Sequence, residues 1–287
     1  MKLELGMGWA WRQREGIDYL VIEAFERSGI VQHGFSTRKG GVSQGPYESL
    51  NIGLHVGDDS DRVRINRQRL ATALAVSSER MVVPAQVHGN QVKVVTGRHA
   101  GAGVQDLSSA LPGVDALVTQ ETDLALCTVY ADCVPVYILD PVHQAIGLAH
   151  AGWKGTTAQI GAQTLQQISA SFGTKARDCL IGIGPSVGPC CYEVDRSVWR
   201  QFTAAFSLKD RARISQVGTI SNRFYLNLWE ANRLTLMAGG VLAANIWIAG
   251  ICTRCHQDWF YSYRAAEGQE TGRMAAVLAL RIDRLSA

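Results

Sequence analysis

The stretch 115–151 constrains the fold of this 287-residue chain more than any other part of the sequence, because four strand-like segments follow one another closely. Each segment is short and strongly apolar, which is typical of buried strands. The four segments are DALVT, LALCTVY, VPVYILD and AIGLAHA. Strands that come in runs, rather than alternating with helices, favour an α+β layered sandwich with mixed sheets over a Rossmann or barrel fold.

The flanking sequence extends this prediction. Further strands are predicted at IDYLVIEAF, IVQHGFST, LIGIG and NIWIAGICT, and a final apolar segment at RMAAVLALRI. Helices are predicted at about 62–76, capped by Asp59 or Ser60, at about 156–171, and in SVWRQFTAAF and LNLWEANRLTLMAG. No internal repeat and no Pro/Ser-rich linker divides the chain.

Composition excludes several classes of protein. With 47% apolar residues, 18% charged residues and a net charge of only +3, the chain is expected to be a soluble globular protein without a nucleic-acid or membrane partner. There is no apolar run long enough for a membrane span and no export-like N-terminus, so we expect a cytoplasmic location. The seven cysteines are an odd number in a large chain, which favours reduced thiols over a disulfide framework.

Three metal-competent side chains share one local design. His88 in QVHGN, Cys133 in YADC and His150 in AHAGW each lie at the end of an apolar strand, beside small or turn residues. Two imidazoles and one thiolate match an open zinc site, in which the fourth position is left for water or substrate. Zinc would lower the pKa of water at that position toward about 7.

The spacing leaves two other interpretations open. His88 and His150 can be core histidines with satisfied hydrogen bonds, and Cys133 a buried apolar thiol. Alternatively, Cys133 is a nucleophile and His150 its base, with Asp132 or another carboxylate orienting the imidazole.

Glycine-rich segments supply candidate anion sites. Ser36 and Arg38 lie among glycines in 33–47, residues 182–194 offer backbone amides at a turn, and Lys154 stands at the start of a helix in GWKGTT. Such segments can hold a phosphate or a carboxylate, although glycines also serve tight turns alone.

The string CTRCH at 252–256 has the C-x-x-C-H pattern of haem attachment. Because no export signal is present, a redox or structural thiol pair, or plain packing, is favoured instead. Arg264 and Arg273 follow this string, and either can reach an anionic ligand.

Taken together, the motifs resemble the peptidoglycan editing factor family, which is also described as a purine nucleoside phosphorylase family and was formerly called a multicopper polyphenol oxidoreductase, or laccase domain. The resemblance covers about residues 33–280, and its most specific pieces are ADC and HAGWKGT at this separation. The other motifs that carry it are HGFSTRKGGVS, SLNIGLHVGDD, VxxNR, QVHG, DALVT, IGPSVGPCCYEV, ANR and CT…SYR…TGR.

This resemblance implies one catalytic domain over 1–287 with a four-layer α-β-β-α fold. It also implies a zinc ion held by His88, Cys133 and His150. The implied activity is purine nucleoside phosphorolysis, with adenosine deamination and methylthioadenosine cleavage as further activities. An alternative is a peptidoglycan editing hydrolase that removes mis-incorporated serine from the nucleotide-linked muropeptide precursor UDP-MurNAc-L-Ser. A non-catalytic metal-binding protein is a third possibility, but structural zinc sites usually have four ligands.

Individual roles follow from these reactions. Asp132 and Glu193 are the candidate proton carriers, with Cys133 as the ligand or nucleophile beside them. Phosphorolysis needs cations on the phosphate side of the ribose, since negative charge develops there. The candidate substrate- or phosphate-binding residues are Ser36, Arg38, Asn51, Lys154 and Arg264.

Laccase chemistry is not expected. The seven histidines include no H-x-H pair, and one cysteine with two histidines can bind one copper ion but cannot carry out four-electron reduction of oxygen. Copper would therefore reflect mis-metallation. Two departures from the family pattern, Asn227 in place of aspartate and Ala265 in place of arginine, leave substrate contacts at those positions open.

Overall fold

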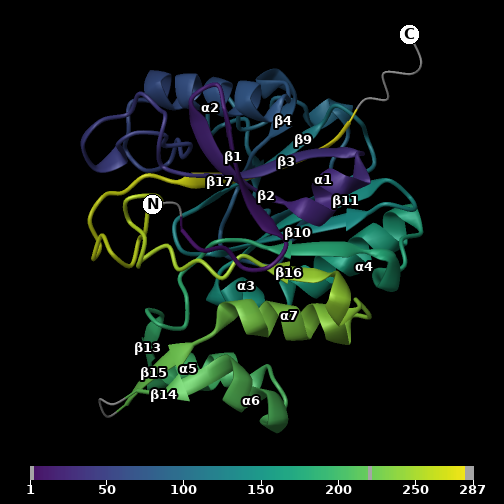
Figure 1. Cartoon of the computed structure of the whole chain (residues 1–287), viewed down its shortest axis with the longest axis vertical. Helices are drawn as coiled ribbons and strands as arrows, with labels where there is room; N and C mark the ends of the chain where they lie inside the picture. Colours follow the sequence, from purple (N-terminus) through teal and green to yellow (C-terminus); the bar gives the residue numbers. More distant parts are fainter. Residues whose placement is uncertain (1–2, 219–221, 282–287) are drawn as a thin grey trace.

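The computed structural model describes residues 3–218 and 222–281. Within them, two six-stranded mixed sheets pack face to face (Figure 1). The first sheet has the order β1 (Trp9–Arg14), β2 (Ile17–Ile22), β3 (Val31–Ser36), β17 (Met274–Leu280), β9 (Ala125–Tyr130) and β4 (Met81–Val82). The second has the order β16 (Ile246–Ile248), β12 (Leu180–Ile183), β10 (Val134–Asp140), β11 (Ala145–Ala151), β8 (Ala116–Thr119) and β6 (Val92–Val94).

Helices cover the outer faces of both sheets. In Figure 1, α2 lies against the first sheet, while α3, α4 and α7 lie against the second. The helices are α1 (Glu23–Ser28), α2 (Ser60–Leu74), α3 (Trp153–Thr157), α4 (Ile160–Phe172), α5 (Arg196–Ala204), α6 (Leu208–Ile214) and α7 (Leu228–Ala238). A small sheet of β13 (Glu193–Asp195), β15 (Arg223–Leu226) and β14 (Ser215–Val217) extends from the second side together with α5 and α6. A two-stranded pair, β5 (Pro84–Ala85) with β7 (Leu111–Pro112), completes the strands.

Three apolar cores separate the four layers. Phe35, Leu126 and Tyr137 belong to the core between the sheets. Leu74 packs with the outer face of the first sheet, and Ile168 with that of the second. Each central strand sends alternate side chains into two cores, so both of its faces are buried and its sequence is a continuous apolar run. The predicted four-layer α-β-β-α sandwich is therefore confirmed.

The antiparallel pairing of β10 with β11 brings two predicted metal ligands together. Val134 pairs with Ala151, and Pro135 pairs with His150. Cys133 directly precedes the first of these pairs, so it reaches the same end of the hairpin as His150. Because register fixes which residues stand opposite each other, the two side chains meet without a special loop.

Several element boundaries differ from the sequence-based expectation. The segment IDYLVIEAF leaves its sheet after Ile22, and its last three residues begin α1. The helix predicted at 156–171 is interrupted, because Gln159 adopts a positive φ of 58° between α3 and α4. Of NIWIAGICT, only β16 is a strand. The start of α2 is as expected, since the Asp59 carboxylate accepts two backbone N–H groups of its first turn.

No helix within the described residues has both the length and the apolar character needed to cross a membrane.

Candidate metal centre

His88, Cys133 and His150 meet at one end of the sandwich. Their ligand atoms all lie within 4.8 Å of one another. His150 is on β11, Cys133 is in the turn between β9 and β10, and His88 is in the loop after β5. Three elements that are far apart in the sequence thus converge on one point, and a set of two imidazoles and one thiolate suits zinc or copper.

Glycines in the HAGWKG segment allow this approach. A Cβ atom on Gly152 would lie 3.0 Å from His88 Cδ2 and 3.1 Å from Cys133 Sγ. A Cβ atom on Gly155 would lie 2.9 Å from the Gly89 carbonyl oxygen. Any larger residue at these positions would push the His88 loop away from the strand ends.

A fully buried carboxylate, Asp115, holds both histidines. Its Oδ1 lies 2.8 Å from His150 Nδ1, and the same oxygen accepts the His88 backbone N–H at 3.0 Å. Its Oδ2 accepts the Gly89 N–H at 2.8 Å. With Nδ1 engaged, His150 presents Nε2 to the centre, which is the usual carboxylate–histidine arrangement of metal sites.

Asp115 was not among the residues selected from the sequence, although it is the first residue of the DALVT motif. The available signal was a single acidic residue at the entrance to a fully buried strand, a position where a charge requires a partner.

The charges of the neighbouring groups change the pKa of Cys133 and of His150. Burial raises the pKa of Cys133, but His150 and His88 outweigh this effect and bring it to about 6. Burial likewise lowers the pKa of His150, but Cys133 and Asp115 raise it to about 9. The thiolate form, which both a metal and a nucleophilic mechanism require, is therefore favoured at neutral pH. In either case the carboxylate that orients His150 is Asp115, and not Asp132.

Asp132 instead links three segments around the centre. It has a positive φ of 85°, which is unusual for a residue other than glycine. Its carboxylate accepts hydrogen bonds from Thr253 Oγ1 at 2.5 Å, Ser262 Oγ at 3.0 Å and the Arg264 N–H at 2.6 Å. These three bonds fix the turn that carries Cys133.

A cavity of about 720 Å³ opens beside the metal centre. Its polar lining includes His55 and three arginines, Arg67, Arg264 and Arg273. Its apolar and aromatic lining includes Val83, Pro84, Leu107, Val129, Trp153, Val187, Tyr192, Leu228 and Tyr263. The volume is in the range of small-molecule sites, and the lining combines flat apolar walls with concentrated positive charge.

The three cavity arginines form no ion pair with a carboxylate among the described residues. Arg67 donates to the Ile52 and Val104 carbonyls, and burial lowers its pKa to about 10, so it remains charged at neutral pH. Arg273 donates through Nη1 to the Thr271 and Gly272 carbonyls. The cavity therefore carries an excess of positive charge that suits an anionic ligand.

The family model described as multi-copper polyphenol oxidoreductase laccase matches residues 32–281. The chain belongs to this family.

Proteins with similar sequences and structures match this chain over most of its length. Purine nucleoside phosphorylase YlmD of Geobacillus stearothermophilus is 42% identical over 275 residues, covering 94% of this chain and 97% of that protein. Purine nucleoside phosphorylase YlmD of Bacillus subtilis is 39% identical, covering 86% and 88%. The solved structure of Bacillus licheniformis YfiH has a TM-score of 0.88 at 34% identity, covering 94% of this chain and 99% of that one. The solved YlmD structure from Geobacillus stearothermophilus also has a TM-score of 0.88, at 39% identity, covering 95% and 99%.

In this laccase-family chain, only part of the predicted site lines the cavity. Besides the three metal-competent residues, Asp132 and Arg264 line it. The residues Ser36, Arg38, Asn51, Lys154 and Glu193 are not part of the lining.

Each of these five residues has another partner. Buried Ser36 accepts the Ala275 N–H, and Arg38 donates to the Glu48 and Gln257 carbonyls. Asn51 accepts the N–H of the cavity residue Arg273 at 2.8 Å. The Glu193 carboxylate accepts from Tyr225 on the small sheet, and Lys154 lies over the Trp153 ring.

The two residues that depart from the family pattern, Asn227 and Ala265, make local hydrogen bonds. Asn227 caps α7, because its side chain accepts the Glu230 N–H at 3.1 Å, and an aspartate would cap equally well. The backbone N–H of Ala265 donates to Ser262 Oγ, beside the hydrogen bond that Ser262 makes to Asp132.

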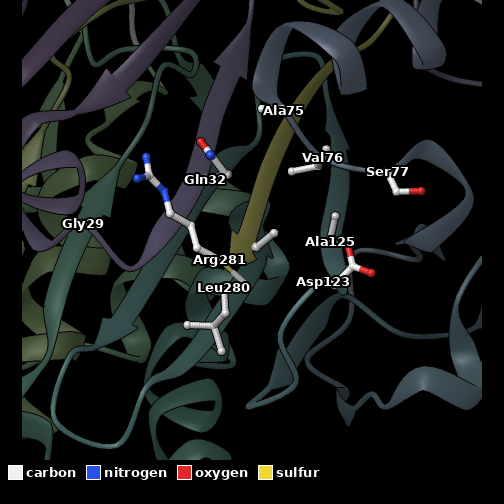
Figure 2. Close-up of a pocket in the computed structure, with 10 residues that line it drawn as sticks. Gly29, Gln32, Ala75, Val76, Ser77, Asp123, Ala125, Leu280 and Arg281 are labelled. Carbon is white, nitrogen blue, oxygen red and sulfur yellow. The ribbon is translucent and has the colours of Figure 1, made fainter. Parts of the chain in front are cut away.

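Figure 2 shows a different hollow, of about 460 Å³, between the ends of α1 and α2. It is lined by Gln32, Val76 and Arg281 among others, and Arg281 donates to the Val31 carbonyl. None of the predicted site residues lines this hollow, whereas five of them line the larger cavity.

Proposed function

We propose that this chain is a zinc-dependent purine nucleoside phosphorylase, that 1–287 acts as one catalytic domain, and that it works in the cytoplasm on small-molecule substrates. The observation that carries the proposal is the placement of three arginines without carboxylate partners beside His88, Cys133 and His150. The relatives named purine nucleoside phosphorylase support the same reaction class.

The arginines supply the phosphate side of the reaction. In phosphorolysis an oxygen of phosphate bonds to the anomeric carbon of the ribose while the bond to the purine nitrogen breaks, and the base leaves with the electron pair. Arg264 and Arg273 hold the phosphate on one face of the sugar, where their charge favours the transition state over the neutral nucleoside. Arg67 adds charge from the buried side of the cavity.

The aromatic wall supplies the base side. Trp153, Tyr192 and Tyr263 offer flat surfaces against which a purine can stack. The guanidinium of Arg264 lies 5.0 Å from the centre of the Tyr192 ring. The residue proposed to bind phosphate is therefore next to an aromatic ring proposed to stack on the purine.

The donor set fits zinc at the three-residue centre. One thiolate and two imidazoles leave a coordination position free, and zinc bound there supplies a Lewis acid next to the reacting groups. Asp115 fixes the orientation of His150, and Asp132 fixes the Cys133 turn. We also propose adenosine deamination and methylthioadenosine cleavage at this cavity. Asp132 is the nearer candidate for moving a proton, since the Glu193 carboxylate faces the small sheet. Copper would occupy the same ligands only by mis-metallation.

The test is to incubate zinc-loaded protein with adenosine, inosine or methylthioadenosine in phosphate and to separate the products by chromatography. We expect free base and ribose 1-phosphate, or the methylthio sugar phosphate, and we expect Cys133→Ala to lose both. Cys179→Ala is the matched control, because Cys179 is a buried thiol outside the centre. Intact nucleosides together with serine release from UDP-MurNAc-L-Ser would contradict phosphorolysis and support the editing hydrolase. No turnover of either substrate would support a non-catalytic metal-binding protein.

A further inference from the structure

A second cluster of metal-competent residues lies outside the cavity lining. The thiols of Cys190, Cys191, Cys252 and Cys255 all lie within 4.8 Å of one another. The first two belong to the loop after β12, and the other two to the loop after β16. None of the four lines the cavity, and the fold brings them together across more than sixty residues of sequence.

The distances between these sulfur atoms match a shared metal ion. Cys190 Sγ lies 3.6 Å from Cys255 Sγ, and Cys191 Sγ lies 3.4 Å from the same atom. Four thiolates at about 2.3 Å from a tetrahedral zinc ion stand about 3.8 Å apart. A disulfide would bring two sulfurs to about 2.05 Å, and it would leave the other two thiols without a reason to gather there.

The backbone at Gly188 lies in close contact with the sulfur atoms of the cluster. The Gly188 N–H donates to Cys252 Sγ at 3.2 Å. A Cβ atom on Gly188 would stand 3.3 Å from Cys190 Sγ and 3.1 Å from Cys252 Cβ, so a side chain there would press on the cluster. The Cys191 N–H donates to the Gly188 carbonyl at 2.9 Å, which closes the turn that presents both adjacent cysteines.

Further contacts join the two loops. Ser186 and Cys252 form a parallel β-bridge. In this bridge the Ser186 N–H donates to the Ile251 carbonyl, and the Thr253 N–H donates to the Ser186 carbonyl. The Arg254 guanidinium lies close enough to Cys191 and Cys252 for these groups to raise its pKa, so one positive charge offsets part of the negative charge of four thiolates.

We propose that Cys190, Cys191, Cys252 and Cys255 form a second zinc site, which is closed and structural and separate from the His88–Cys133–His150 centre. Four sulfur ligands complete a tetrahedral zinc ion and leave no position for substrate. An all-thiolate set also excludes hard cations such as magnesium and calcium. Zinc undergoes no redox change, so the site serves to hold the two loops together.

The two loops carry residues of the cavity wall. Tyr192, which follows Cys191, lines the cavity and packs on Arg264. Thr253, which follows Cys252, donates to the Asp132 carboxylate, and the Val187 N–H donates to the Asp132 carbonyl. The second zinc therefore holds the wall around Asp132 and Arg264. Zinc binding by the four thiols is independent of the proposed function, whereas its effect on turnover rests on that function.

The first test counts zinc per chain by elemental analysis of protein purified under reducing conditions. We expect two zinc ions in the wild type, one in Cys190→Ser/Cys255→Ser and one in His150→Ala. Cys179→Ala is the control and keeps two. Only one zinc ion in the wild type, absent from His150→Ala, would overturn the proposal.

The second test does not depend on any cysteine variant folding. X-ray absorption at the zinc edge of His150→Ala, whose four-cysteine cluster is untouched, should show a shell of four sulfur atoms and no imidazole. A mixed sulfur and nitrogen shell would overturn the proposal. So would a mass spectrum of the freshly reduced wild type in which a disulfide forms between Cys255 and Cys190 or Cys191 while zinc is in excess.

The effect on activity distinguishes this proposal from a failure of the proposed function. If nucleosides are not substrates, the zinc count and the sulfur shell are still expected. If they are substrates, we expect Cys190→Ser/Cys255→Ser to keep the zinc of the catalytic centre and to raise the KM for phosphate several-fold through Arg264.

Discussion

The two clusters of metal-competent residues both contain cysteine, but they differ in their other ligands and in the space beside them. At the His88–Cys133–His150 centre three ligands lie at the edge of a cavity, and a buried carboxylate orients one of them. At the four-cysteine cluster the sulfur atoms lie outside the cavity lining, and Cys190 and Cys255 are exposed. An open ligand set leaves a place for a reacting molecule, whereas a closed set only joins segments of chain. In the proposed assignment, the number of ligands and the neighbouring space distinguish the catalytic from the structural site, and the presence of thiols does not.

The largest expected effect comes from removing a ligand of the open site. We expect Cys133→Ser to lower kcat/KM by more than about 100-fold, because even the loss of residues that only orient metal ligands costs 10- to 100-fold. Steady-state kinetics with Cys179→Ala as the control measures this. Equal activity of the two variants would show that Cys133 takes no part.

Asp115→Asn tests the buried partner of the open site. The amide keeps the size of the side chain but removes the charge that fixes His150 and accepts three backbone N–H groups. We expect zinc affinity or kcat to fall by about 10- to 100-fold. Competition with a chromophoric chelator gives the zinc affinity. An unchanged affinity together with an unchanged kcat would show that Asp115 does not support the metal centre.

A comparison of arginines separates the cavity from the glycine-rich loop. We expect Arg264→Lys to raise the KM for phosphate by about 10-fold, since one charge-assisted hydrogen bond contributes about 1.5–3 kcal/mol. Arg38→Lys is expected to change it little, because Arg38 donates to backbone carbonyls outside the cavity. A larger effect at Arg38 than at Arg264 would place the phosphate site in the loop.

A prediction on stability rather than activity concerns two buried histidines with opposite pKa shifts. The pKa of His150 is raised beside Cys133 and Asp115, whereas burial lowers the pKa of His33 to about 3. His33 stays neutral in the fold but takes up a proton in the unfolded chain below about pH 6.5. It therefore contributes stability that is lost as pH falls from about 6.5 toward 3, by up to about 1.4 kcal/mol per pH unit.

Denaturant unfolding between pH 7 and pH 5 measures that slope. In His33→Gln the amide oxygen can still accept the Ile22 N–H that His33 Nε2 accepts at 2.8 Å, and the acid slope is expected to be shallower than in the wild type. An identical slope in both proteins would show that His33 is not the group that takes up the proton.

The sequence predicted the fold most accurately in strands whose two faces are both buried. The strands of 115–151 are apolar on both faces because each lies between two cores, so their bounds could be predicted closely. The ends of those strands also pointed to Cys133 and His150, and the QVHG turn pointed to His88, and the fold brings all three together. The EAF segment was predicted wrongly because its apolar residues continue the strand pattern, although the chain turns into α1 there.

Side-chain direction was the information that the sequence lacked. Nothing in the linear order indicates that Asp115 faces His150, or that Arg273 points into the cavity while Arg38 bonds backbone carbonyls. These contacts depend on register between distant strands and on the path of loops. The four-cysteine cluster was likewise hidden, because its two halves lie on different loops.

The measurement that tests the central claim most directly is the yield of ribose 1-phosphate from inosine, followed as phosphate is titrated into the zinc-loaded protein. We predict a product that requires phosphate, saturates with it and disappears in Cys133→Ser. Free ribose formed without phosphate, or ribose 1-phosphate formed equally by Cys133→Ser, would contradict the assignment of phosphorolysis to this centre.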